Sequence, residues 1–125
     1  MTRQILIGEA GSGKTYAAQR YAGSSPDVVV VDGCDGLPPQ AIADAWHATA
    51  ADEIILITQT PESVADYLAT ADAVILFRQH RHVLQWYADY PPCGQVIEPA
   101  RLDALRYAQQ GKGIVITPDG ITAIV

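Results

Sequence analysis

Four short apolar runs alternate, over the first two thirds of the chain, with segments whose apolar residues recur at helical spacing. The runs are residues 4–8, 28–31, 54–57 and 73–77, and they are rich in isoleucine and valine, which favour strands. Runs without polar alternation are typical of parallel strands buried on both faces. Strands that alternate with helices predict an α/β fold, a three-layer sandwich with a mostly parallel central sheet.

Helix signals lie between these runs. Helix formers extend from Lys14 to residue 21 or 22, where the sequence Gly-Ser-Ser-Pro at 23–26 ends the first helix. The Leu-Pro-Pro sequence at 37–39 opens a second helix, and Thr60 is a good N-cap for a third that ends near Thr70. The inward-facing residues would be Ile42, Ala45, Trp46 and Thr49 in the second helix, and Val64, Tyr67 and Leu68 in the third.

The last third of the chain predicts one helix and a C-terminal β-hairpin. The helix begins at Pro99 and ends before Gly111. Its inward face would consist of Leu102, Leu105 and Ala108. The apolar runs 114–117 and 121–125 flank a Pro-Asp-Gly turn signal, so we expect them to pair as a hairpin. Two interpretations remain for residues 83–90: a short helix, or a loop that packs its aromatic rings.

Composition narrows the class of protein. The 125 residues fit a single domain, residues 1–125, and no apolar run approaches the roughly 18 residues needed to cross a bilayer. No secretory signal is visible before the first strand. Cys34 and Cys93 lack metal-ligand spacing and are too few for a disulfide framework. We therefore expect reduced thiols, no membrane contact and a cytoplasmic location.

The net charge limits the partners that the chain can bind. The formal charge is −6 at pH 7, so bulk attraction does not favour nucleic acid. The local strip Arg-Gln-His-Arg-His at 78–82 is cationic and could contact nucleic acid, with a solvated loop as the alternative. His47 is read as a surface or half-buried side chain, and Trp86, Tyr87 and Tyr90 as core packing or as a wall for a nucleobase.

A phosphate-binding pattern, G-x-x-x-x-G-K-T or Walker A, follows the first apolar run. Its residues are Gly8, Glu9, Ala10, Gly11, Ser12, Gly13, Lys14 and Thr15, and Tyr16 comes next. A strand leads into this loop and a helix leaves it, so free N–H groups and the helix dipole point at one anion. A glycine-rich turn before an ordinary helix is the alternative, which these flanking elements disfavour. We expect the segment to bind ATP or another nucleoside triphosphate in a P-loop NTPase-like fold.

The residue types in this loop suit phosphate chemistry. Gly8, Gly11 and Gly13 let the backbone bend tightly and approach phosphate oxygens where a Cβ would intrude. Lys14 would reach the β- and γ-phosphates, and the Thr15 hydroxyl would bind Mg²⁺.

The carboxyl ends of the other strands should carry the rest of the site, because ligands of such sheets bind there. Asp32 follows four valines, the Walker B pattern, and would hold Mg²⁺ beside Thr15. An Asp that only starts a turn is the alternative. The other candidates are the Thr-Gln pair at 58–59 and Arg78, whereas Asp52 and Glu53 precede their strand and lie at the wrong end.

The segments 28–32, 54–61 and 71–78 together resemble the FtsK/HerA group of ATPases, which includes phage genome-packaging motors and Zot-like assembly proteins. The resemblance covers about residues 4–82. It implies that Gln59 senses the γ-phosphate, and that Arg78 or Arg81 stabilises transition-state charge in its own or a neighbouring subunit. It also implies a homo-oligomer in a bacterial or phage-infected cell, with nucleic acid or a larger viral machine as partner.

Two departures from the family pattern bear on hydrolysis. The Glu that the family places directly after the Walker B Asp is Gly33 here, and the nearby acids, Asp35 and Glu9, do not stand at the matching position. Asp32 also follows Thr15 by only seventeen residues, fewer than the family uses. Three functions therefore remain open: an ATPase, a small-molecule kinase with Arg78 and Arg81 on a lid, and a nucleotide-binding module without turnover.

Overall fold

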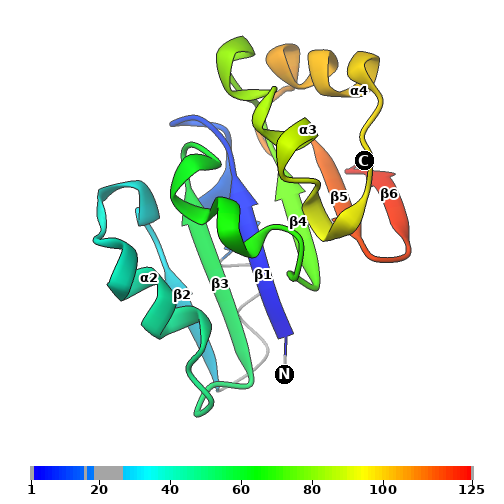
Figure 1. Cartoon of the computed structure of the whole chain (residues 1–125). Coiled ribbons are helices and arrows are strands. Elements are labelled where there is room, and N and C mark those ends of the chain that lie inside the picture. The colour runs from blue at the N-terminus through cyan, green and yellow to red at the C-terminus, as the bar shows by residue number, and fades with distance from the viewer. Residues whose placement is uncertain (1, 16, 19–26, 125) are drawn as a thin grey trace.

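The structure, a computed structural model, describes residues 2–15, 17–18 and 27–124 and contains one six-stranded sheet (Figure 1). The strands are β1 (Thr2–Ile7), β2 (Val28–Val31), β3 (Glu53–Thr58), β4 (Ala73–Leu76), β5 (Ile114–Thr117) and β6 (Gly120–Ala123). The four predicted parallel strands and the predicted C-terminal hairpin are therefore confirmed.

The order of the strands is β2-β3-β1-β4-β5-β6. The first four run parallel, and the β5–β6 hairpin adds to β4 in antiparallel fashion. Leu6 in β1 pairs with Ile57 of β3 on one side and Ile75 of β4 on the other. β3 thus lies between the strand that leads to the phosphate loop and the strand that ends at Asp32. The carboxyl ends of β1, β2, β3 and β4 meet at one edge.

One face of the sheet carries most of the helical segments and the larger core. Helices α2 (Pro39–Trp46) and α3 (Trp86–Asp89) lie on this face with the 3-10 helix Glu62–Tyr67 (Figure 1). The main buried side chains of this core are Ile5, Ile7, Ile42, Trp46, Ile54, Leu56, Val64, Leu68, Val74, Leu76 and Tyr87. Among the described residues, the larger hydrophobic cluster therefore lies on the side of α2 and α3.

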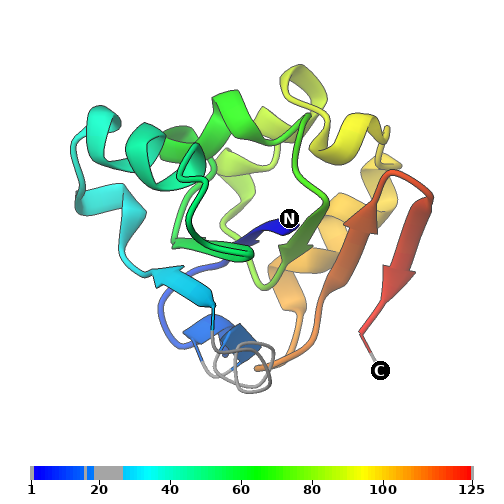
Figure 2. The ribbon, with the colours of Figure 1, turned by 90° about the horizontal axis from the view of Figure 1, so that it is seen from below.

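The opposite face is covered, within the described residues, by the start of the helix that follows the phosphate loop (Figure 2). Ala17 and Ala18 of that helix pack against a second cluster that includes Leu6, Ile55 and Phe77. Helical structure on both faces confirms the predicted sandwich. The predicted end of this helix, at 21–22, lies outside the described residues.

β2 departs from the expectation that all the apolar runs are buried on both faces. It is an edge strand, and Val29 and Val30 are 44% and 42% exposed. β1, β3 and β4 instead have a neighbour on each side and are buried over most of their length. β-branched residues favour extended backbone at an edge as well as in a core, so an apolar run alone does not distinguish the two.

Several predicted helices are shorter or tighter than expected. The helix predicted after Thr60 is a 3-10 helix over Glu62–Tyr67. A 3-10 helix has three residues per turn, which puts Ala65 and Leu68 together on the buried side. The helix from Pro99 is α-helical only in α4 (Pro99–Ala104) and continues as the 3-10 helix Leu105–Tyr107.

The structure also defines the end of the second predicted helix and the segment that follows β4. α2 ends at Trp46, so Thr49 lies beyond it. The open segment 83–90 contains the end of the 3-10 helix Arg81–Val83 and the short helix α3, whose Tyr87 is buried. Cys93 stands in the left-handed region, with φ 54°, in the 3-10 helix Pro92–Gly94.

A buried polar pair closes the carboxyl end of β4. Gln79 is 2% exposed; its Nε2 donates to the Ile7 carbonyl at 2.9 Å and its Oε1 accepts from the Tyr87 hydroxyl at 2.7 Å. Burial raises the pKa of Tyr87 far above its ordinary value, so this hydroxyl stays protonated and donates. The pair ties the segment after β4 to β1, directly beside the phosphate loop.

We expect Gln79→Leu to lower the free energy of unfolding by about 2 kcal/mol, because it leaves the buried Tyr87 hydroxyl without an acceptor and removes one of the two hydrogen bonds to the Ile7 carbonyl, which keeps the bond from the Phe77 N–H. Urea denaturation followed by circular dichroism measures the change. Adding Tyr87→Phe should recover part of the loss, since the unpaired hydroxyl is then removed. Gln85→Leu, on the exposed side of the same segment, is the control and should change stability little. Equal stability of Gln79→Leu and the wild type would contradict the role of the pair.

Candidate nucleotide site

The predicted phosphate loop starts between the ends of the two strands that flank β1. The Gly8 N–H donates to the Thr58 carbonyl of β3 at 3.2 Å, and the Glu9 N–H donates to the Arg78 carbonyl after β4 at 2.9 Å. The loop is therefore anchored on both sides. Thr58 and Arg78 stand at this edge of the sheet, where the sequence placed the rest of the site.

The glycines of the loop occupy positions that a side chain would obstruct. A Cβ on Gly8 would come within 2.5 Å of Ser12 Oγ and 2.7 Å of Phe77 Cβ. Gly13 has φ 93°, and a Cβ there would meet the backbone nitrogen of Gly111 at 2.8 Å. The compact path of the loop thus requires glycine at both positions.

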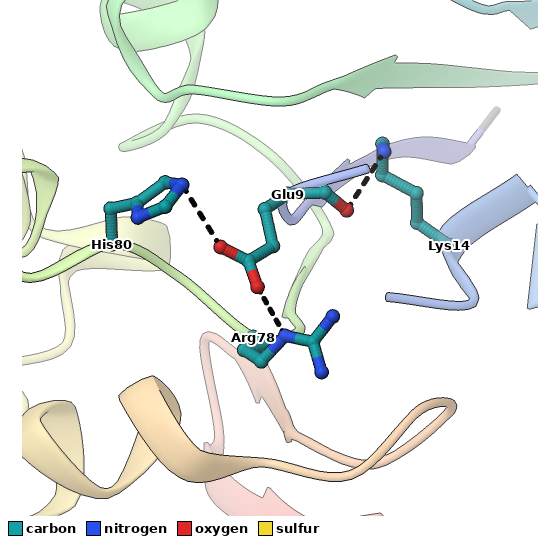
Figure 3. A network of polar contacts seen from close by, with 4 residues as sticks. All are labelled: Glu9, Lys14, Arg78 and His80. Carbon is teal, nitrogen blue, oxygen red and sulfur yellow. Dashed lines mark hydrogen bonds and ion pairs between the residues drawn. The ribbon is translucent and has the colours of Figure 1, made fainter. Parts of the chain in front are cut away.

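Lys14 folds back over its own loop. Its side chain is 8% exposed, and Nζ donates to the Glu9 carbonyl at 3.3 Å (Figure 3). The Ala17 N–H bonds the Gly13 carbonyl, so the helix begins here and Lys14 lies in its first turn. The ammonium is thereby held at a helix N-terminus, where anions are favoured. Tyr16, predicted to flank the nucleotide, lies outside the described residues.

Asp32 and Thr15 lie in contact, although β3 separates the strand before Asp32 from β1, the strand that leads to Thr15. Thr15 Oγ1 donates to Asp32 Oδ2 at 3.3 Å, and both residues are exposed. The pairing of these two predicted metal ligands results from the sheet, since the residues are 17 positions apart.

A hydroxyl and a carboxylate oxygen are hard ligands of the kind that Mg²⁺ prefers. No cluster of three or more His, Cys, Asp or Glu occurs among the residues that the structure describes. Mg²⁺ usually retains several waters and uses one or two protein groups plus phosphate oxygens. The Thr15–Asp32 pair could therefore hold Mg²⁺ together with a bound triphosphate.

Arg78, predicted to stabilise charge, lies against the phosphate loop of its own chain. Its Nε forms an ion pair with Glu9 Oε1, while His80 Nε2 lies 3.1 Å from Glu9 Oε2 (Figure 3). Glu9 thus has a basic partner on each carboxylate oxygen. Arg81, the alternative candidate, is exposed in the 3-10 helix Arg81–Val83.

Gln59, the predicted γ-phosphate sensor, has an exposed side chain at the end of β3. Its backbone N–H donates to Asp35 Oδ1 at 3.3 Å, and Thr58 Oγ1 lies 3.4 Å from the same oxygen. The Thr-Gln pair therefore adjoins the turn that follows Asp32. The sequence does not predict this contact between the ends of β2 and β3.

The segment before β5 completes the site and was missed in the sequence. The Gly111 N–H donates to the Ser12 carbonyl at 2.8 Å. Gln110 lines a cavity of about 240 Å³ together with Gly11, Gly13, Lys14 and Thr15. No local pattern could have identified these residues, because they reach the loop only through the pairing of β5 with β4.

Another cavity, of about 370 Å³, adjoins the phosphate loop at Glu9. Its lining residues are Glu9, Gln79, His80, Arg81, Arg106 and Tyr107. Tyr107 is 71% exposed, and the Arg106 guanidinium lies 5.0 Å from the centre of its ring. The predicted cationic strip at 78–82 is thus extended by Arg106.

The aromatic residues of the segment 83–90 and the two cysteines differ in burial. Tyr87 is a core residue, whereas Trp86 stacks on the exposed Tyr90 at 5.5 Å between ring centroids. Cys34 and Cys93 are free thiols, as predicted, and burial raises the pKa of each to about 11. They are therefore protonated and poorly reactive at neutral pH.

No protein-family model matches the sequence, and no curated protein matches it. Solved structures do match. The DNA-packaging ATPase B204 from Sulfolobus Turreted Icosahedral Virus has a TM-score of 0.69 and 15% identity, over 99% of this chain and 97% of that chain. The fold is that of a P-loop NTPase.

The P-loop NTPase fold is shared with two further structures. The genome packaging NTPase B204 from Sulfolobus turreted icosahedral virus 2, in complex with AMP, has a TM-score of 0.67 and 15% identity, over 99% of this chain and 96% of that chain. VirB4 of Thermoanaerobacter pseudethanolicus has a TM-score of 0.61 and 18% identity, over 88% of this chain and 33% of that chain. The resemblance to packaging ATPases is thus confirmed for the fold.

Among the described residues, no helix has the length and apolarity to span a membrane.

Proposed function

We propose that this chain binds ATP or another nucleoside triphosphate with Mg²⁺ and hydrolyses it. The contact between Thr15 and Asp32 carries the proposal, because it joins the end of β2 to the helix after the phosphate loop across the intervening strand β3. Support also comes from B204, whose structures hold AMP, AMPPCP and ATP-gammaS. The roles of the loop residues follow from their chemistry.

In this proposal the backbone N–H groups of the loop bind the β- and γ-phosphates, and Lys14 exchanges the Glu9 carbonyl for phosphate oxygens. Thr15 and Asp32 would hold Mg²⁺, which neutralises charge on the phosphates. Arg78 lies beside the loop and would stabilise charge that develops on the γ-phosphate. Gln59, directly after Thr58 at the end of β3, would orient the attacking water.

The biological role that we propose is nucleic-acid packaging or translocation, as a homo-oligomer or within a larger viral machine. B204 is described as a DNA-packaging ATPase, and the cationic cavity lined by His80, Arg81 and Arg106 would face nucleic acid. The electrostatic contribution of this cavity to nucleic-acid binding should weaken as the salt concentration rises.

Phosphate release, with and without DNA and with a panel of phosphate acceptors, tests this function. Turnover without an acceptor supports the ATPase. Turnover that requires an acceptor would instead identify a small-molecule kinase. Tight binding without turnover would identify a nucleotide-binding module, the alternative that Gly33 in the place of the family's Glu favours.

We expect Asp32→Asn to lower Mg²⁺-dependent turnover by about 100-fold, because the amide is a weaker ligand for Mg²⁺ than a carboxylate. Phosphate release measured over a Mg²⁺ titration checks this, and the urea midpoint should stay unchanged because Asp32 is exposed. Asp27→Asn, before the amino end of the same strand, is the matched control and should retain activity. An unchanged Mg²⁺ dependence would show that Asp32 is only a turn residue.

A further inference from the structure

The position that carries a Glu in the resembling ATPases has no side chain here. Gly33 directly follows Asp32 and has φ 71°, in the left-handed region that favours glycine. If water is activated by a carboxylate of this chain, the acid must stand elsewhere at the carboxyl edge of the sheet. The structure separates the two candidates, Glu9 and Asp35.

Glu9 is engaged on both carboxylate oxygens. Arg78 Nε pairs with Oε1, and His80 Nε2 lies 3.1 Å from Oε2 (Figure 3). Its side chain is 22% exposed. Both carboxylate oxygens of Glu9 therefore already have partners, and a water could reach either of them only by displacing Arg78 or His80. The structure therefore disfavours Glu9 as the base.

Asp35 is carried to the end of β3 by the turn that Gly33 begins. The chain leaves Gly33 in a 3-10 helix, Cys34–Gly36, in which the Gly36 N–H donates to the Gly33 carbonyl at 2.9 Å. Cys34 is fully buried and anchors this helix to the core. The left-handed glycine and the buried thiol thus fix the direction in which the next side chain leaves.

The Asp35 carboxylate is held through one oxygen only. Oδ1 accepts from the Gln59 N–H at 3.3 Å and lies 3.4 Å from Thr58 Oγ1. No hydrogen bond or ion pair engages Oδ2 among the described residues. A carboxylate positioned by one oxygen, with the other available, is suited to accept a proton.

The anchors of Asp35 adjoin the phosphate loop. Thr58, which lies beside Asp35 Oδ1, also accepts through its carbonyl the N–H of Gly8, the first loop residue, at 3.2 Å. Three positions before Asp35, Asp32 accepts from Thr15. Asp35 therefore stands at the same edge as the loop and the metal-binding pair.

We propose that Asp35 is the catalytic carboxylate of this chain and replaces the missing Glu as general base. The inference rests on the proposed nucleotide hydrolysis. A water oxygen attacks the γ-phosphorus while a water proton passes to Asp35 Oδ2. The bond from the γ-phosphorus to the bridging oxygen breaks, and its electrons remain on the nucleoside diphosphate. Asp35 then returns the proton to solvent.

The decisive variant is Asp35→Asn, which preserves size and an acceptor for the Gln59 N–H but removes the base. Single-turnover hydrolysis of ATP with Mg²⁺ should slow by about 10²- to 10³-fold, while affinity for AMPPCP changes by less than about two-fold. Asp35→Glu should restore part of the rate, since it restores a carboxylate.

Two acids from the same cavity as Asp35 provide matched controls. Glu62 and Asp66 line this space of about 430 Å³, and Glu62→Gln and Asp66→Asn should keep the wild-type rate. An Asp35→Asn variant that binds AMPPCP and hydrolyses ATP within about three-fold of wild type would overturn the assignment and leave the ATPase intact. A wild type that binds nucleotide but shows no turnover would overturn hydrolysis itself.

Discussion

Lys14→Ala should weaken the binding of a nucleoside triphosphate by about 100-fold or more. The side chain is 8% exposed and holds its ammonium at the phosphate loop, where its present partner is only a carbonyl oxygen. A bound triphosphate would replace that carbonyl with charged oxygens, and hydrogen bonds between charged groups are about twice as strong as neutral ones. Losing about 3 kcal/mol of such contacts corresponds to about two orders of magnitude in affinity.

Calorimetric titration with AMPPCP and Mg²⁺ measures the loss. The chain has one other lysine, Lys112, which is exposed on the turn beside Gly111, so Lys112→Ala is a control of equal charge change. The free energy of unfolding of Lys14→Ala should stay within about 1 kcal/mol of wild type, because the variant loses one hydrogen bond to a carbonyl. Retained affinity in Lys14→Ala would refute the assignment of the loop.

Gly113→Ala should cost about 3 kcal/mol or more of folding free energy. A Cβ at Gly113 would lie 2.0 Å from the Leu76 carbonyl oxygen and 3.0 Å from its carbon. The obstacle is backbone, so no side-chain rotation relieves the overlap, and β5 must move away from β4. A loss of this size is a large fraction of the stability of a domain.

Urea denaturation tests this expectation, with Gly36→Ala as the control. A Cβ at Gly36 would meet nothing within 4 Å, so that variant should be almost as stable as the wild type. Gly113→Ala should also weaken nucleotide binding, because Gly111 on the adjoining turn bonds the Ser12 carbonyl of the phosphate loop. A Gly113→Ala protein with wild-type stability would show that the β4–β5 junction adapts without cost.

Local patterns identified much of the site because its chemistry is concentrated in short segments. The phosphate loop is a continuous motif, and the valine run before Asp32 marks a strand end. Parallel strands bring their carboxyl ends to one edge, so the sequence also predicted that Thr15 and Asp32 would lie together. The Thr-Gln pair at 58–59 and Arg78 were placed at this edge for the same reason.

Contacts between residues far apart in the sequence could not be predicted from local patterns. The ion pair between Glu9 and Arg78, and the contact of Gln59 with Asp35, each join segments from different strands. The burial of Gln79 was also not predicted, since a polar residue after a strand is usually exposed to solvent. Its burial arises because Ile7 and Tyr87 supply both hydrogen-bond partners.

The sequence by itself determined the strands, and it predicted the phosphate loop and the groups that would bind phosphate and Mg²⁺ in the proposed function. Periodicity and turn chemistry act over a few residues, and a continuous motif needs no tertiary contact to be recognised. The tertiary structure alone decided that β2 is an edge strand, that Gln110 and Gly111 complete the loop's surroundings, and that Glu9 is paired while Asp35 keeps one oxygen available. Strand order and long-range packing fix these features, because they depend on which segments meet in space.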